Sequence, residues 1–198
     1  MSLSIRDTLR EYDVILASSS PRRKDLLQLI CSNFRVIPPE CDEKLPADIP
    51  TSEAAEFLSD IKCRYIAEIY ENSIVIGCDT MVICGGVIYG KPHDEEDARR
   101  MLRALSGKEH TVVSGVTIGY QKKFLSFSVS TAVTFRHLSD ADIDIYCRSG
   151  EPMDKAGAYG IQGSGSLLVK KINGDFYNVV GLPVSEIAAN LEGFLQTV

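Results

Sequence analysis

The sequence predicts a globular protein of α/β or mixed α+β class, and three observations support this prediction. Apolar residues make up 44% and charged residues 24% of the 198 residues, the usual balance of a chain with one well-buried core. Apolar runs typical of strands alternate along the chain with amphipathic stretches typical of helices. No linker, repeat or low-complexity tract divides the sequence. We therefore expect a single domain over residues 1–198.

The periodicity of apolar residues predicts each element in turn. In the first half of the chain we expect a strand at 12–17, a short helix from 21, an extended segment at 34–46, a helix over about 52–71 and a strand at 73–83 that returns in a hairpin at 87–92. A helix at 95–105, strands at 110–120 and 124–138 and a helix at 140–150 follow. The chain then continues with a glycine-rich loop at 150–165, a second hairpin at 166–182 and a closing helix at 183–195.

Local signals justify the ends of these elements. Pro21 suits the first position of a helix, and Asp94 is a typical N-cap. Ser139 with Asp142 predicts a helix start of the capping-box type. The pair Gly85-Gly86 predicts a two-residue turn. In regular register this turn pairs Thr80 with Lys91, which would direct the lysine away from the face that carries Asp79.

The pair Asn173-Gly174 predicts the second hairpin, because this dipeptide favours a tight turn between strands. The segment 150–165 holds five glycines without a clear period. This composition predicts an irregular loop whose backbone approaches another group closely.

Composition also excludes several classes of protein. The formal net charge of -6 argues against a nucleic-acid-binding surface. No run of about 18 apolar residues predicts a membrane span, and the polar segment 1–13 does not resemble a secretory signal. The six cysteines form no CxxC pair and have no zinc-like spacing. We expect reduced, buried thiols and a cytoplasmic protein.

The stretch ILASSSPRRKDLL at 15–27 predicts an anion site. A serine-rich turn between a strand and a helix start offers hydroxyls and free N–H groups to phosphate. Arg22 and Arg23 add forked donors at a helix end that otherwise repels cations. The structural alternative is a solvated basic turn in which Ser20 is only an N-cap. The stretch lacks the Gly-x4-Gly-Lys pattern of a P-loop.

Asp79 is the second unusual residue, because it lies in the apolar run VIGCDTMVI. A buried lone carboxylate is unfavourable by several kcal/mol unless a cation or metal compensates. Asp79 is therefore either a structural residue held by a lysine or backbone donors, or a metal ligand or general base. Asp42, Glu43 and Lys62 taken singly are expected to be exposed charges. An anion site together with a buried carboxylate suggests metal-assisted attack on a phosphate chain.

These stretches occur in the same order as in a known family. The segments LASSSPRRKDLL, DE at 42–43, GCDTMV, GKP, LSGKEHTVVSGV, DKAGAYGIQG and INGDFYNVVGLP resemble the Maf family, the septum-formation-inhibitor-like nucleotide pyrophosphatases. The resemblance extends from Ile15 to Pro183. It implies a mixed α/β fold with two lobes, a central mixed sheet and an active-site cleft, related to inosine-triphosphate pyrophosphatases. It also implies hydrolysis of a nucleoside triphosphate to the monophosphate and pyrophosphate with Mg²⁺ or Mn²⁺, and a homodimer.

The resemblance also implies roles for individual residues. Arg22, Thr80 and Gln162 match the branch of the family that prefers dTTP and UTP. Asp79 matches the catalytic proton acceptor, and Glu43 matches an acidic metal-site position, with Asp79 as the other metal ligand. The other substrate-binding positions are Ser18, Arg23, Lys62 and Lys91. The amide of Gln162 offers both a donor and an acceptor to a pyrimidine edge.

Two alternatives remain open at the level of sequence. The first is a pyrophosphatase specific for ITP or XTP, and the second is a non-catalytic nucleotide-binding regulator of septum formation. A panel of triphosphates separates the first from a dTTP/UTP enzyme, and release of pyrophosphate excludes the second.

Overall fold

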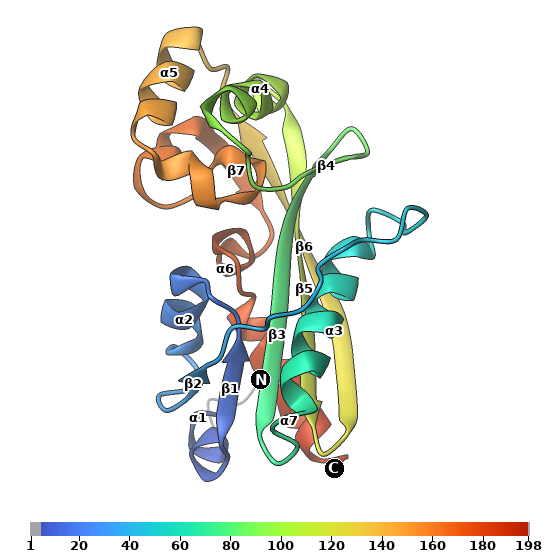
Figure 1. Cartoon of the computed structure of the whole chain (residues 1–198). Coiled ribbons are helices and arrows are strands. Elements are labelled where there is room, and N and C mark those ends of the chain that lie inside the picture. Colours follow the sequence, from blue (N-terminus) through green and yellow to red (C-terminus); the bar gives the residue numbers. More distant parts are fainter. Residues whose placement is uncertain (1–4, 198) are drawn as a thin grey trace. The chain divides into compact units, whose positions relative to one another are not determined.

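The computed structural model describes residues 5–197, and the chain divides into two compact units (Figure 1). Unit 1 comprises the described residues of Met1–Asp79, Ser114–Val129 and Gly181–Val198. Unit 2 comprises Thr80–Val113 and Ser130–Val180. Three strands, β3, β5 and β6, contribute residues to both units, so the boundary falls within strands rather than in a linker.

The bounds of the elements are as follows. The helices are α1 (Ile5–Thr8), α2 (Pro21–Leu27), α3 (Ala54–Ala67), α4 (Glu95–Leu105), α5 (Asp140–Arg148), α6 (Phe176–Val180) and α7 (Val184–Leu195), and the strands are β1 (Val14–Ala17), β2 (Arg35–Val36), β3 (Ile74–Cys84), β4 (Val87–Tyr89), β5 (Glu109–Tyr120), β6 (Lys123–Phe135) and β7 (Val169–Asn173). Short 3-10 turns are η1 (Leu9–Glu11), η2 (Glu151–Asp154), η3 (Ala156–Ala158) and η4 (Gly163–Leu168).

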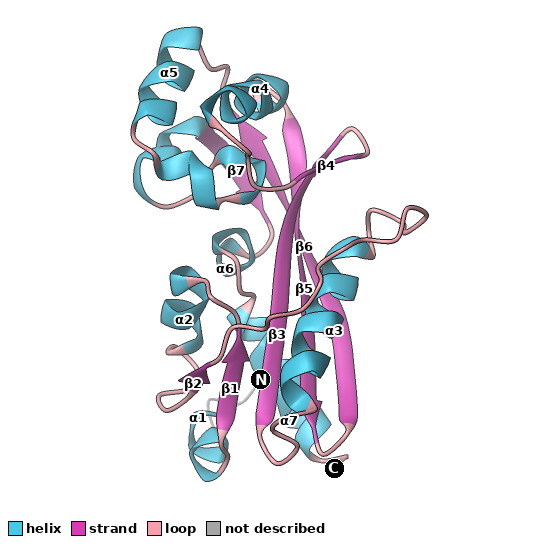
Figure 2. Ribbon diagram, viewed as in Figure 1, coloured by secondary structure: helices cyan, strands magenta, loops and turns pink. Residues whose placement is uncertain are grey.

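Within residues 5–197, seven strands form a mixed sheet with the order β2-β1-β3-β5-β6-β7, and β4 pairs with β3 (Figure 2). Strand β1 is parallel to β2 and to β3, and its last residue, Ala17, pairs with Gly77. β6 and β7 are antiparallel. Because β1 ends at Ala17 whereas β3 continues past Gly77 to Cys84, the turn that follows Ala17 begins beside the middle of β3.

The core of unit 1 forms where α3 packs on the sheet. Ile15, Ala17 and Val75 of the strands contact Cys63 and Ile66 of the helix, and all five are at most 1% exposed. Burial of such apolar surface is the main stabilising contribution to folding.

Two glycines allow α3 to lie very close to the strands. A Cβ atom at Gly77 would lie 2.5 Å from the carbonyl oxygen of Ser59, and one at Gly115 would lie 2.2 Å from the backbone of Ala55 and Glu56. Side chains at these two positions would therefore push the helix away from the sheet.

The core of unit 2 lies under α4 and α5, which pack against each other. Its buried members include Val82, Leu102, Val133 and Phe135. His110 is part of this core and is 2% exposed, with its Nε2 atom 2.8 Å from the hydroxyl of Tyr159. Its ring also makes edge contacts with the rings of Phe135 and Tyr159. The histidine thus occupies a place that is suited to a neutral ring.

We expect His110 to make the stability of the protein depend on pH. Burial lowers its pKa from 6.5 to about 4, so the unfolded state binds the proton first. The contribution of the neutral His110 to the free energy of unfolding is complete above pH 6.5 and is lost as pH falls toward 4. The loss is about 3 kcal/mol at most. Urea unfolding at pH 7.5 and pH 4.5 measures this difference in the free energy of unfolding. In the His110→Gln variant this part of the pH dependence should disappear, and equal pH dependence in both proteins would contradict the assignment.

Most elements predicted from the sequence are confirmed. Ser139 and Asp142 form the predicted capping box at α5, and Asp94 caps α4 by accepting a hydrogen bond from the backbone N–H of Asp97 at 2.8 Å. The turn at Gly85-Gly86 has the predicted register, with Cys84 opposite Val87. Pairing ends at Tyr89, however, so Thr80 and Lys91 are outside the ladder.

The prediction of a hairpin across Asn173-Gly174 is wrong. β7 pairs with β6 instead, with Ile172 opposite Val133, and the following residues form helix α6. The physical reason is Asp175, whose Oδ1 atom accepts a hydrogen bond from the N–H of Tyr177 at 2.7 Å and so starts a helix. The hydroxyl of Thr131 also bonds to the backbone N–H and carbonyl of Asp175, both at 3.1 Å, which fixes this start on β6.

The segment 150–165 also differs from its prediction. It was expected to be an irregular loop, but it contains η2, η3 and the start of η4. Gly150, Gly157 and Gly163 have positive φ, the conformation that favours glycine, and link these turns.

All six cysteines are free, as expected for reduced thiols. Four of them are buried: Cys31, Cys63, Cys78 and Cys147. Within residues 5–197, no helix has the length and apolar character that crossing a membrane requires.

Candidate active site

The candidate active site in unit 1 centres on the buried ammonium group of Lys62. This side chain is 9% exposed, and its Nζ atom lies 2.5 Å from Oδ1 of Asp79 and 2.8 Å from Oε2 of Glu43. Asp79 is itself largely buried, with 15% of its side chain exposed, whereas Glu43 is half-exposed at 48%. The two acids, which are 36 positions apart in the sequence, therefore meet at one cation.

The close packing of α3 explains why Lys62 reaches both acids. Lys62 is followed by Cys63. A Cβ atom added at Gly77, two residues before Asp79, would lie only 2.8 Å from the Cβ atom of Cys63. The backbone of the helix therefore lies directly against β3 at this point, and the lysine side chain reaches Asp79 on the same strand. The expectation that Lys62 and Glu43 are simply exposed charges is wrong for Lys62, which is buried.

The charge state of Lys62 follows from its surroundings. Burial opposes the charged form, but the charges and hydrogen bonds of Asp79 and Glu43 outweigh this effect and raise the pKa of Lys62 above its usual value. The lysine is therefore a fixed positive charge at neutral pH. This charge compensates the buried acid, as required for a carboxylate inside an apolar strand.

The serine-rich turn after β1 begins beside the part of β3 that carries Asp79, since Ala17 pairs with Gly77. Ser18 is 5% exposed, and its Oγ atom accepts hydrogen bonds from the N–H of Ser20 and from Nη1 of Arg23, both at 3.2 Å. The oxygen of Ser18 is the acceptor in both of these bonds, so its hydroxyl proton can be donated to an anion. Ser20 caps α2 by accepting a hydrogen bond from the N–H of Arg23 at 3.4 Å.

Gly181 joins this turn to the middle of β3, at Cys78. Its carbonyl oxygen accepts hydrogen bonds from Nε of Arg23 at 3.0 Å and from the thiol of Cys78 at 3.5 Å. Arg23 is consequently held beside the residue that precedes Asp79. Sequence reasoning did not find this role of Gly181, because a backbone acceptor has no side-chain signature. The only signal in the sequence was the stretch Gly181-Leu182-Pro183, whose glycine and proline predict a break between α6 and α7.

The other predicted residues are placed as follows. Arg22 is half-buried in the first turn of α2, within unit 1. Thr80 follows Asp79 on β3 and is half-buried. Lys91 follows β4 and is exposed, and Gln162 is exposed immediately before η4. Thr80, Lys91 and Gln162 belong to unit 2. Within unit 1 the structure thus brings Glu43, Lys62 and Asp79 into contact, and it separately brings Ser18 into contact with Arg23.

The acidic residues of this site suit a divalent cation in number and chemistry. Magnesium is typically held by one or two carboxylates together with phosphate oxygens of a substrate. Glu43 and Asp79 each bind Lys62 through one oxygen, Oε2 and Oδ1, so a cation here would be held by the other oxygen of each carboxylate. No cluster of three or more His, Cys, Asp or Glu side chains suited to a metal occurs among residues 5–197. A cation here would therefore depend on a phosphate ligand to complete its coordination.

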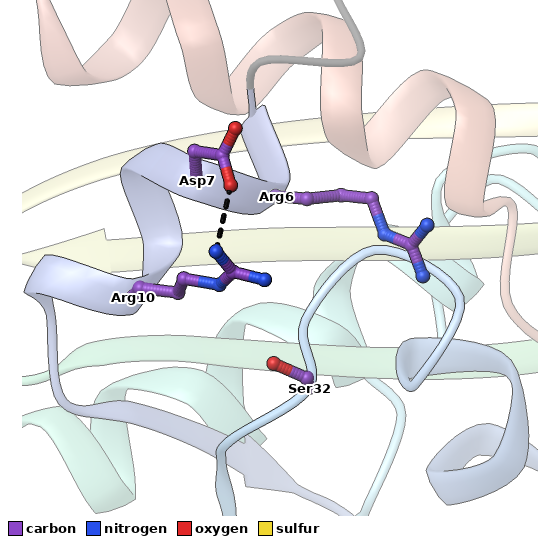
Figure 3. A pocket seen from close by; sticks show the side chains of 4 residues that line it. All are labelled: Arg6, Asp7, Arg10 and Ser32. Atoms are coloured by element: carbon purple, nitrogen blue, oxygen red, sulfur yellow. Dashed lines mark ion pairs between the residues drawn. The ribbon is translucent and has the colours of Figure 1, made fainter.

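A pocket of about 390 Å³ lies elsewhere in unit 1 and is lined by Arg6, Asp7, Arg10 and Ser32 (Figure 3). Arg10 forms an ion pair with Asp7 at 3.0 Å, and both side chains are more than two-thirds exposed. Figure 3 shows Arg6 directed away from this pair. Exposed pairs of this kind contribute little binding energy, so we assign no substrate to this pocket.

Comparison with known proteins identifies the family of this chain. A family model described as "Maf-like protein" matches residues 13–194. Similar proteins named "dTTP/UTP pyrophosphatase" come from Bacillus velezensis (48% identical, covering 91% of this chain and 96% of the relative), Thermosipho africanus (47%, covering 88% and 89%) and Dictyoglomus turgidum (46%, covering 92% and 96%).

A solved structure of the Staphylococcus aureus Ham1 protein is also similar, with a TM-score of 0.53 and 15% identity over 91% of this chain and 98% of that one. At this identity the likeness shows the fold alone, and it agrees with the mixed α/β fold described above. The match over residues 13–194 includes both acids, the serine-rich turn and Lys62. The chain therefore belongs to the Maf family.

Proposed function

We propose that this protein hydrolyses dTTP and UTP to the nucleoside monophosphate and pyrophosphate. The observation that carries the chemistry is the meeting of Asp79 and Glu43 at Lys62, on the strand β3 whose Gly77 pairs with Ala17, the residue before the turn of Ser18. The base preference rests on the relatives, which are 46–48% identical and are named for dTTP and UTP. The residues Arg22, Thr80 and Gln162 also match the pyrimidine branch.

In the proposed mechanism the cationic residues bind the triphosphate. Arg22, Arg23 and Lys91 supply donors to phosphate oxygens, and Ser18 donates its hydroxyl proton to the same group. Lys62 offsets negative charge that develops at the reacting phosphate and keeps Asp79 in place. Thr80 and Gln162 are proposed as further substrate contacts, because their positions match the motifs of the branch.

Asp79 is the proposed acceptor of the proton of the attacking water. Its neighbour Lys62 orients the carboxylate through the bond at Oδ1, which leaves the second oxygen for water. A divalent cation, Mg²⁺ or Mn²⁺, would be held by Asp79 and Glu43, and when bound it supplies a Lewis acid for the phosphate oxygens. Most of the rate enhancement should come from positioning and charge stabilisation, as is general for phosphoryl chemistry.

Several features support the setting that we propose for this reaction. The family match over residues 13–194 includes residues of both units, which supports one Maf-like domain. Six free cysteines are typical of a reducing compartment such as the cytoplasm. The net charge of -6 argues against a nucleic acid as partner. A homodimer, as the family resemblance implies, is checked by measuring the mass in solution.

The test of this function is a substrate panel. Pyrophosphate release would be measured with Mg²⁺ for dTTP, UTP, dCTP, GTP, ITP and XTP at equal concentrations. We expect dTTP and UTP to have the highest kcat/KM. A preference for ITP or XTP would support the purine-type alternative. Binding of nucleotides without any pyrophosphate would support a regulator without catalytic activity.

We expect Arg22→Ala to weaken substrate binding. Hydrogen bonds to charged groups contribute ~1.5–3 kcal/mol, so KM for dTTP should rise by a factor of ~10–150 with a smaller change in kcat. Arg23→Ala is the informative comparison, because Arg23 also binds Gly181 and Ser18 and its loss should lower the melting temperature as well. A fall in kcat alone for Arg22→Ala would contradict a role in binding the ground-state phosphates.

A further inference from the structure

The carboxylate of Glu151 organises the chain around Gln162 within unit 2. Its Oε1 atom accepts hydrogen bonds from the hydroxyl of Tyr146 at 3.1 Å and from the N–H of Gly165 at 3.2 Å. Its Oε2 atom accepts a hydrogen bond from the N–H of Ser164 at 3.1 Å. One half-buried side chain in η2 therefore binds two successive backbone amides at the start of η4.

The hydroxyl of Tyr146 provides a second attachment point on the same segment. Tyr146 is 4% exposed, and its oxygen accepts a hydrogen bond from the N–H of Gly160 at 3.2 Å. Burial raises the pKa of this tyrosine, so its hydroxyl keeps its proton and can donate it to Glu151. Tyr146 and Glu151 thus hold the segment 160–165 at both ends.

The glycines of this segment allow it to lie close to these two side chains. Gly163 has a φ of +64°, and a Cβ atom there would lie 3.1 Å from a carboxylate oxygen of Glu151. A Cβ atom at Gly165 would lie 2.1 Å from the carbonyl oxygen of Gly160 and 2.8 Å from the hydroxyl of Tyr146. The close approach predicted from the glycine-rich composition is therefore an approach to Glu151 and Tyr146.

Gln162 lies between the two attachment points. Its backbone is extended, with φ of -94° and ψ of 165°, and its side chain is exposed. Because Gly160 is fixed on one side and Gly163, Ser164 and Gly165 on the other, the direction of the Cα–Cβ bond of Gln162 is also fixed. An amide that is to distinguish one pyrimidine edge from another needs such a fixed direction, since donor and acceptor must not exchange places.

We propose that Glu151 is a positioning residue for base selection, which acts by holding the segment 160–165 so that the amide of Gln162 points in one direction. This inference rests on the proposed function, in which Gln162 contacts the base. It assigns Glu151 and Tyr146 to the preference among pyrimidines and not to the hydrolysis itself.

The test compares kcat/KM for dTTP and for dCTP, whose base presents the opposite donor and acceptor pattern at position 4. The variants are Glu151→Ala, Glu151→Gln, Tyr146→Phe, Gln162→Ala and the double variant Glu151→Ala/Gln162→Ala. Glu96→Gln is the matched control, because it removes the same charge from an exposed position of unit 2. Glu151→Gln keeps the size of the side chain and serves if Glu151→Ala does not fold.

We expect Glu151→Ala to reduce the preference for dTTP over dCTP about tenfold, the usual value of one specific hydrogen bond to a substrate. Glu151→Gln should have the same effect to a smaller degree, since it presents an NH2 group to an N–H donor. The double variant should show no lower preference than Gln162→Ala alone, because Glu151 acts through Gln162. Hydrogen exchange at the amides of Ser164 and Gly165 should become faster in Glu151→Ala.

An unchanged preference in both Glu151 variants, when Gln162→Ala lowers it, would overturn the inference and leave the proposed function intact. Full additivity in the double variant would also overturn it. A wild-type protein that releases no pyrophosphate would instead refute the proposed function. In that case the exchange rates at Ser164 and Gly165 still show whether Glu151 holds the segment, and unchanged rates would contradict the inference independently.

Discussion

Replacing Asp79 by Asn is expected to lower kcat for dTTP ~100-fold or more. The asparagine retains the shape of the side chain, but it cannot accept a proton from water and it binds a divalent cation poorly. Lys62 would keep only Glu43 as an anionic partner. Steady-state pyrophosphate release at saturating dTTP and Mg²⁺ measures the effect.

A matched control separates this effect from the loss of one negative charge. Glu186→Gln removes an exposed carboxylate from the first turn of α7, also in unit 1, and should leave kcat within a factor of about two. If Asp79→Asn retained turnover within a few-fold of the wild type, Asp79 would not be the catalytic proton acceptor. Asp79 would then be a structural partner of Lys62.

Replacing Gly115 by Ala is expected to have the largest effect on stability. The added Cβ would lie 2.2 Å from backbone atoms of Ala55 and Glu56, and a backbone cannot rotate away as a side chain can. Helix α3 would have to move off the sheet, and Lys62 would move with it. We expect a loss of at least ~3 kcal/mol in the free energy of unfolding, together with a fall in kcat.

The comparison for Gly115→Ala is Gly193→Ala. A Cβ at Gly193 meets no atom within 4 Å, and this residue lies inside α7, where alanine favours the helix more than glycine does. Chemical denaturation should therefore show unchanged or slightly increased stability for Gly193→Ala. A Gly115→Ala protein as stable and as active as the wild type would contradict the account of how α3 is positioned.

The sequence predicted those elements whose determinants are local. Ser139 with Asp142 at α5, Asp94 at α4 and Pro21 at α2 act within a few residues of one another, so their patterns can be read directly. The segment after Asn173 was predicted wrongly, because Asp175 starts a helix there and the contact that fixes this start on β6 is with Thr131, more than 40 positions away. A local turn signal cannot report such a partner.

The candidate site was predicted in its residue types but not in its geometry. The apolar neighbours of Asp79 indicated a buried acid, and the serines and arginines at 18–23 indicated an anion site. The burial of Lys62 could not be read from its helix, because it depends on the absence of side chains at Gly77 and Gly115 on other elements. The link from Arg23 to Gly181 joins residues 158 positions apart and uses a carbonyl group, which every residue has.

The most direct test of the central claim is to identify the bond that is broken. Phosphorus NMR of dTTP incubated with the wild-type protein and Mg²⁺ distinguishes the products without a coupled enzyme. The account predicts dTMP and pyrophosphate in equal amounts, from attack between the α and β phosphates. Formation of dTDP and inorganic phosphate, or intact dTTP after prolonged incubation, would contradict it.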